Sequence, residues 1–150
     1  MKAPAEQSLP FWEALQEMVK NNSLRIDRPR GSRHPRYPDF IYPLDYGYLE
    51  GTRSADGGGV DVWLGTDRAS CAAGLELAAA GQEAGEAHAL SLSGLLLTVD
   101  RIKQDVEVKL LLNCTHEEME IALKASNSPS MTAILLAQEN LDSNFTEGTS

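Results

Sequence analysis

The stretch that decides the fold is YPLDYGYLEGTRSADGGGVDVWLG, which runs from Tyr42 to Gly65. Its two ends are rich in aromatic and β-branched residues and predict strands at 40–49 and 60–64. Three consecutive glycines lie between them and can bend tightly, because glycine tolerates positive φ. Asp56 and Asp61 flank these glycines, so the bend can direct both carboxylates to one point, as a cation site requires. Ordinary turn chemistry explains an aspartate beside a glycine equally well.

The remaining elements follow from periodicity and capping. Ser8 as N-cap and Pro10 in the first turn predict an N-terminal helix, whose apolar stripe consists of Phe11, Leu15, Met18 and Val19. A short strand is expected at 24–26, followed by a proline-rich loop at 27–39 that cannot be helical. Strands are expected at 94–100 and 105–112, and a helix from the capping box of Thr115 and Glu118. The segment 130–138 is compatible with a strand or a helix.

A second pair of aspartates, Asp100 and Asp105, repeats the five-residue spacing of the first pair across another turn. Four carboxylates from neighbouring strands suit Mg²⁺, which prefers oxygen ligands and commonly binds beside phosphates. Basic residues that would suit a phosphate are concentrated in one segment, at Arg25, Arg28, Arg30, Arg33, His34 and Arg36. The alternative is that the aspartates flank hairpins and the arginines form a solvated loop.

The charge balance limits the classes of partner. The chain of 150 residues has a net charge of -9, which argues against general nucleic-acid binding. The longest apolar run, GLLLTV at 94–99, is too short to cross a membrane. The first 16 residues lack the pattern of a signal peptide, and the two cysteines, Cys71 and Cys114, show no metal-type spacing. A cytoplasmic protein with reduced thiols is expected.

Two motifs resemble the soluble family I inorganic pyrophosphatases. In that family a Tyr-Pro-x-x-Tyr-Gly-Tyr strand precedes an Asp-x-Asp-Pro-x-Asp loop, and IYPLDYGYLEGTRSADGGGVDV at 41–62 is similar to both. GLLLTVDRIKQDVEVK at 94–109 resembles the strand–turn–strand unit that carries the family's other metal-binding aspartates. IDRPRGSRHPRY at 26–37 is a weaker match. The motifs occur in the family's order and cover roughly half of the chain.

The resemblance implies an α+β fold that is mainly β, a small five-stranded OB-like closed barrel with flanking helices. It implies a single pyrophosphatase-like domain over 1–139. Within that domain, 66–93 is expected to be an Ala/Gly-rich insertion, and 140–150 a flexible tail. Members of the family commonly form oligomers, so a homo-oligomer is compatible with the resemblance.

The resemblance also assigns roles to individual residues. It implies Mg²⁺-dependent hydrolysis of pyrophosphate, or a similar small phosphoanhydride, by metal-activated water. The implied metal ligands are Asp27, Asp56, Asp61, Asp100 and Asp105. Arg36 would replace a substrate-binding lysine, and Tyr46 would donate its hydroxyl to a phosphate. Arg33 is a candidate replacement for phosphate ligands of the family that this chain lacks.

Three positions depart from the family's pattern. Gly58 stands at the position of the general base, Pro38 at that of a metal-site glutamate, and Glu107 at that of a phosphate-binding lysine. General-base assistance typically contributes about 10²–10⁴-fold to a rate. Two functions therefore remain open: an inorganic diphosphatase, with activity reduced by the loss of the base, or a weak or inactive module that binds metal and a phosphorylated ligand. A purely structural role is a third reading, in which the carboxylates would repel one another without purpose.

Overall fold

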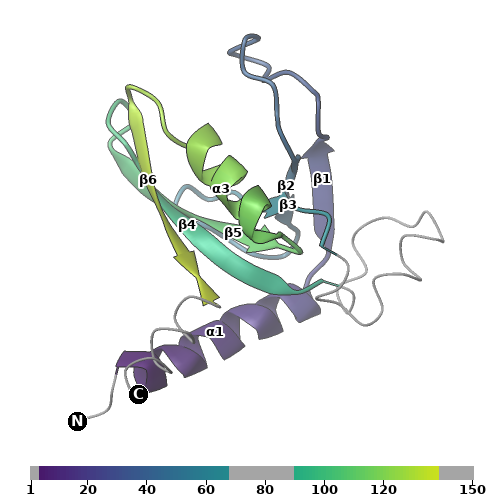
Figure 1. The fold of residues 1–150 in the computed structure, drawn as a ribbon, viewed down its shortest axis with the longest axis vertical. Coiled ribbons are helices and arrows are strands. Elements are labelled where there is room, and N and C mark those ends of the chain that lie inside the picture. The colour runs from purple at the N-terminus through teal and green to yellow at the C-terminus, as the bar shows by residue number, and fades with distance from the viewer. Residues whose placement is uncertain (1–3, 68–89, 139–150) are drawn as a thin grey trace, which may run out of the picture.

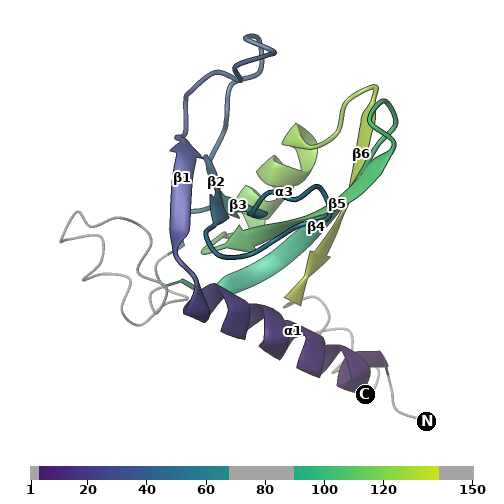
Figure 2. The ribbon, with the colours of Figure 1, turned by 180° about the vertical axis from the view of Figure 1, so that it is seen from behind.

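The computed structural model describes residues 4–67 and 90–138. These residues form one mixed six-stranded sheet in the order β1-β2-β3-β5-β4-β6, together with helices α1 and α3 (Figures 1 and 2). The predictions for Cys71, for residues 68–89 of the insertion and for the tail at 140–150 lie outside the described residues.

The elements have the following bounds. The strands are β1 (Leu24–Arg28), β2 (Asp45–Leu49), β3 (Val60–Leu64), β4 (Leu92–Asp100), β5 (Asp105–Leu112) and β6 (Met131–Ala137), and the helices are α1 (Pro4–Asn21) and α3 (His116–Ala125). Neighbouring strands are antiparallel, except that β3 and β5 are parallel. This parallel pair places β3, which directly follows the three glycines, beside β5.

The expected closed five-stranded barrel was wrong, because the sheet has six strands and is open. β1 and β6 are its edges, and no strand pair joins them within the described part of the chain. In both views α3 lies between β6 and the side formed by β1, β2 and β3 (Figures 1 and 2). Its buried Met119 and Ala122 belong to one core cluster with Trp63 of β3 and Ala137 of β6. The helix thus fills the space across which the two edges would have to meet.

Each face of the sheet packs into a core cluster over part of its area, and successive side chains of a strand enter different clusters because they point to opposite faces. On β3, Val62 belongs to the core cluster that contains Trp12 and Val19 of α1, whereas Trp63 belongs to the cluster that contains residues of α3. On β5, Leu110 and Leu111 divide between the two clusters in the same way. The alternation predicted at 60–64 is confirmed.

The N-terminal helix begins earlier than expected. It starts at Pro4, where a proline suits the first turn, so Ser8 is not the N-cap and Pro10 lies inside the helix. Phe11 is 51% exposed whereas Trp12 is only 3% exposed. Trp12 therefore takes the core position expected for Phe11, whereas Leu15, Met18 and Val19 of the predicted stripe pack in the core as expected.

The predicted strand at 40–49 is shorter than expected, and β2 begins only at Asp45. Pro43 has no N–H to donate to a strand partner, which explains the interruption. Before it, Ile41 makes an isolated antiparallel bridge with Arg33. The strands at 60–64 and 105–112 are confirmed, and 131–137 is a strand.

The capping box at the start of α3 also connects this helix to the segment that follows β3. The Glu118 carboxylate accepts hydrogen bonds from the backbone N–H of Thr115 at 3.0 Å, and from the backbone N–H and the hydroxyl of Thr66 at 3.0 Å and 2.6 Å. Partial burial alone would raise the pKa of Glu118, but these hydrogen bonds outweigh it and lower the pKa below the ordinary 4.5. The ionised carboxylate therefore stabilises the fold.

We expect the Glu118→Gln variant to lose a pH-dependent part of the stability. Because the folded-state pKa is lowered, the contribution of Glu118 is present above the ordinary pKa and is lost as the pH falls through the folded-state pKa. Urea unfolding at neutral and at acidic pH should therefore show a destabilised variant only at neutral pH. Glu120→Gln, an equal charge change at an exposed site on the same helix, is the control. Equal losses at both pH values would contradict the prediction.

Candidate functional site

The site occupies the face of the sheet on which α3 packs, beyond the end of that helix. Asp105, Glu107, Lys109 and Leu111 share this face of β5. Leu111 is fully buried in the cluster with α3, while the three charged residues are half-buried. Asp61 of β3 lies directly opposite Lys109 in the parallel pair. The face therefore changes from an apolar core to a charged, partly open surface along two neighbouring strands.

Lys109 is the centre of this charged surface. Its Nζ donates to the Tyr46 hydroxyl at 2.9 Å and to Asp61 Oδ2 at 3.1 Å, and lies 3.6 Å from Glu107 Oε1. The Lys109 side chain is only 12% exposed. Its three oxygen partners come from β2, β3 and β5, so the sheet register fixes the ammonium among them.

The charges on this surface act on one another. Burial raises the pKa of Glu107; the Lys109 charge opposes this, while the charges of Asp61, Asp105 and Asp56 raise it further. These four carboxylates, Asp56, Asp61, Asp105 and Glu107, are called the acidic cluster below. For Lys109, burial alone would lower the pKa, but its contacts with Tyr46 and Asp61 outweigh burial and raise it. Lys109 is therefore a permanent cation inside a set of carboxylates.

Asp56 belongs to the cluster electrostatically, but its carboxylate binds its own loop. Oδ1 accepts hydrogen bonds from the Ser54 hydroxyl at 2.5 Å and from the Gly58 backbone N–H at 2.9 Å, and these bonds lower the pKa of Asp56. Gly57 has a φ of +92°, the conformation for which the glycine-rich sequence is suited. The loop thus bends as expected, with one of its carboxylates acting as a turn residue.

The other predicted metal ligands lie as follows. Asp100 Oδ1 accepts from the backbone N–H groups of Ile102 and Lys103, both at 3.0 Å, and so caps the β4–β5 hairpin. Asp105 is paired across that hairpin with Asp100 and belongs to the acidic cluster. Asp27 is exposed on β1.

As they lie in the described residues, these donors are not gathered around one point as a divalent cation requires. Carboxylate oxygens are the ligands that Mg²⁺ prefers. However, within residues 4–67 and 90–138 no group of three or more His, Cys, Asp or Glu side chains is placed so that it could hold a metal ion. Asp61 and Glu107 are paired with Lys109, and Asp56 and Asp100 are bonded to their own turns. The metal role of the five aspartates stays a prediction.

A basic cluster is formed by Arg28 at the end of β1, His34 and Arg36 in the loop that follows, and Lys103 in the β4–β5 hairpin. The Arg28 guanidinium donates to the Tyr42 hydroxyl at 2.5 Å, and His34 stacks parallel to the same ring at 6.1 Å. Burial lowers the pKa of His34, and the charges of Arg28, Arg36 and Lys103 lower it further. The charges of three cations, from β1, the loop and the β4–β5 hairpin, therefore act on one imidazole.

The loop is held in place by backbone hydrogen bonds. Tyr42 pairs with both Gly31 and Ser32, and the His34 N–H donates to the Phe40 carbonyl at 2.9 Å. His34 Nδ1 accepts from the backbone N–H groups of Arg36 and Tyr37, so the proton of the neutral imidazole lies on Nε2. The Arg33 guanidinium donates to the Pro38 carbonyl at 2.9 Å, and Arg36 is exposed.

Sequence reasoning missed Lys109, Lys103 and the contact between Arg28 and Tyr42. The signal for Lys109 was present, because alternation places it on the same face of β5 as Asp105 and Glu107. Its role became apparent only from the parallel pairing of β3 and β5. Tyr46, expected to donate to a phosphate, accepts a hydrogen bond from Lys109. Its hydroxyl keeps a proton to donate, so its role toward a phosphate stays a prediction.

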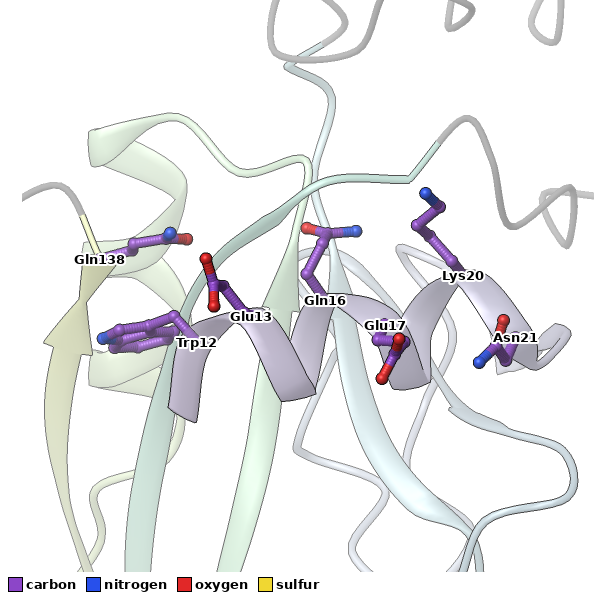
Figure 3. Close-up of a pocket in the computed structure, with 7 residues that line it drawn as sticks. All are labelled: Trp12, Glu13, Gln16, Glu17, Lys20, Asn21 and Gln138. Carbon is purple, nitrogen blue, oxygen red and sulfur yellow. The ribbon is translucent and has the colours of Figure 1, made fainter. Parts of the chain in front are cut away.

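A groove of about 400 Å³ lies elsewhere, along α1 (Figure 3). Its lining consists of Trp12, Glu13, Gln16, Glu17, Lys20, Asn21 and Gln138. None of the predicted site residues lines it. Gln16 accepts from the Leu92 N–H at 2.9 Å and donates to the Leu90 carbonyl at 3.3 Å, and so attaches α1 to the beginning of β4. The groove therefore lies along the junction between α1 and the sheet.

Comparison with known proteins supports the fold. The chain is similar to an inorganic pyrophosphatase from Neisseria gonorrhoeae of known crystal structure, with a TM-score of 0.55, 15% sequence identity, and coverage of 87% of this chain and 90% of that chain. The pyrophosphatase of Helicobacter pylori gives a TM-score of 0.48 at 13% identity, over 85% of this chain and 92% of that chain. No family model and no curated protein matches the sequence. The likeness to the Neisseria structure makes the architecture pyrophosphatase-like. No helix of the described residues is long and apolar enough to cross a membrane.

Proposed function

We propose that this protein binds a small phosphoanhydride, with pyrophosphate as the first candidate, at the basic cluster of Arg28, His34, Arg36 and Lys103. The observation that carries the proposal is the Arg28 guanidinium bonded to the buried Tyr42, whose ring stacks on His34. The charges of Arg36 and Lys103 act on the same imidazole. Guanidinium groups match phosphate oxygens in geometry and charge. The Nε2–H of the neutral His34 adds a donor without a charge. The fold's likeness to pyrophosphatases makes pyrophosphate the natural first compound to test.

Binding without rapid turnover fits the residues better than an efficient enzyme. Gly58 supplies no general base, and Glu107 places a negative charge where the family resemblance implies a phosphate-binding lysine. Lys109 is already paired with Asp61, which the resemblance assigns to metal. Each of these features favours retention of an anion at the basic cluster over its hydrolysis at the acidic cluster.

Calorimetric titration with pyrophosphate tests the proposal. We expect Arg36→Gln to weaken binding by about 10- to 100-fold, because a charge-assisted hydrogen bond is worth about 1.5–3 kcal/mol. Lys20→Gln makes the same charge change on α1, which lies at the opposite end of β1 from the loop (Figures 1 and 2), and should leave the affinity unchanged. Absence of binding, or equal losses in both variants, would overturn the proposal. Inorganic phosphate, titrated in parallel, shows whether the bridging anhydride matters.

Mg²⁺-dependent hydrolysis of pyrophosphate is the second candidate, and the acidic cluster favours it. Four carboxylates with one lysine leave an excess of negative charge, which attracts cations. Phosphate release is measured with Mg²⁺ and with a chelator, for the native chain and for Asp61→Asn. Release that requires Mg²⁺ and is lost in the variant would establish hydrolysis. An aspartate can be accommodated at Gly58, where a Cβ would lie 3.5 Å from Asp56 Oδ1, so Gly58→Asp tests whether the missing base limits the rate.

A further inference from the structure

The Lys109 ammonium lies where a bound cation would have to lie to neutralise the acidic cluster. Its partners are the oxygens of Tyr46, Asp61 and Glu107, at 2.9, 3.1 and 3.6 Å. The ammonium also lies 5.4 Å from the centre of the Tyr46 ring. These contacts use oxygens of two carboxylates that a divalent ion would need.

The surroundings explain why a cation is required at this position. Glu107 is only 13% exposed and Asp61 28% exposed, so water screens their charges weakly. Charges of Asp56 and Asp105 act on the same group. Carboxylates gathered in this way repel one another unless a cation lies between them. Among the described residues, Lys109 is the basic side chain that makes ion pairs with members of this cluster.

We propose that Lys109 is a built-in counter-cation that replaces a divalent metal ion in this carboxylate cluster and lowers the affinity of the cluster for Mg²⁺. Both cations need the oxygens of Asp61, so the ammonium must leave before a metal ion can take them. The inference goes beyond pyrophosphate binding and does not depend on it, because it concerns the cation preference of the folded chain alone.

The test compares the native chain with Lys109→Met, which keeps an unbranched side chain one atom shorter and removes its charge. Thermal unfolding is followed in chelator and in millimolar MgCl₂, and Mg²⁺ binding is measured by calorimetry. We expect Mg²⁺ to raise the Tm of Lys109→Met clearly more than that of the native chain, because a ligand stabilises the state that binds it. The Mg²⁺ affinity of the variant should be at least about tenfold higher. Adding Asp61→Asn to the variant should remove this gain.

Two controls keep the outcome specific. Lys20→Met changes the net charge equally on α1 and should gain no Mg²⁺ affinity, and Lys109→Arg keeps the cation and should also gain none. If Lys109→Met fails to fold without metal, the native chain still provides a test. The Mg²⁺ affinity of the native chain should equal that of the Asp61→Asn variant, because Lys109 already neutralises Asp61 in the native chain. Stronger Mg²⁺ binding by the native chain than by Asp61→Asn, or equal Mg²⁺ effects on the native chain and Lys109→Met, would overturn the proposal.

Discussion

Replacing Gly47 by alanine is expected to destabilise the protein by more than about 3 kcal/mol, beyond the usual range for overpacked sites. A Cβ at Gly47 would lie 1.8 Å from the Arg25 carbonyl oxygen and 2.8 Å from Ile26 Cα. Both are backbone atoms of β1, so no side-chain rotation can relieve the clash. The strands β1 and β2 would have to separate, and β1 leads directly into the loop that carries His34 and Arg36.

Urea unfolding measures this effect, and Gly58→Ala is the matched control. A Cβ at Gly58 would meet only Asp56 Oδ1, at 3.5 Å, which is ordinary contact. The control should therefore change the free energy of unfolding by no more than about 0.5 kcal/mol. A Gly47→Ala variant as stable as the control would show that the backbones of β1 and β2 lie further apart at Gly47 than in this structure.

Leu96→Ala is expected to have the second large effect and to lower the free energy of unfolding by about 2–5 kcal/mol. Leu96 is fully buried in the cluster formed with α3 and lies opposite Lys109 on β5 and Leu135 on β6. The cavity would form beneath the helix that lies between β6 and the β1–β2–β3 side. The substitution would also remove the apolar neighbour of Lys109 across the β4–β5 pair.

The control for this variant comes from the same strand. Val99 is 48% exposed on the opposite face of β4, so Val99→Ala removes methyl groups without opening a buried cavity. Calorimetric unfolding should give a much lower Tm for Leu96→Ala than for Val99→Ala. Similar Tm values would mean that the face beneath α3 is not a packed core.

Residues with strong local signals were predictable from the sequence. The alternation of Val60–Leu64 and the capping box of Thr115 and Glu118 depend on neighbours within a few positions, and both are confirmed. The extent of α1 was mispredicted because Ser8 and Pro10 mimic a helix start, whereas the helix already begins at Pro4. Local capping preferences cannot decide between two acceptable beginnings of one helix.

The open sheet and the role of Lys109 could not be predicted, because both depend on contacts between distant segments. Whether a sheet closes depends on what fills the space between its edges, and here α3 does. The bond between Lys109 and Asp61 joins residues 48 positions apart, through a parallel pairing that sequence periodicity does not specify. Sequence motifs therefore located the acidic residues but not the cation that neutralises two of them.

The open sheet has a consequence for how the protein behaves at high concentration. Unpaired strand edges offer N–H and C=O groups to other chains, and charged side chains on an edge discourage such pairing. β1 carries Arg25, Asp27 and Arg28 along its edge, whereas β6 has no charged residue from Met131 to Ala137 and exposes Ile134. Intermolecular strand addition, and the aggregation that follows from it, is therefore expected to begin at β6 and not at β1.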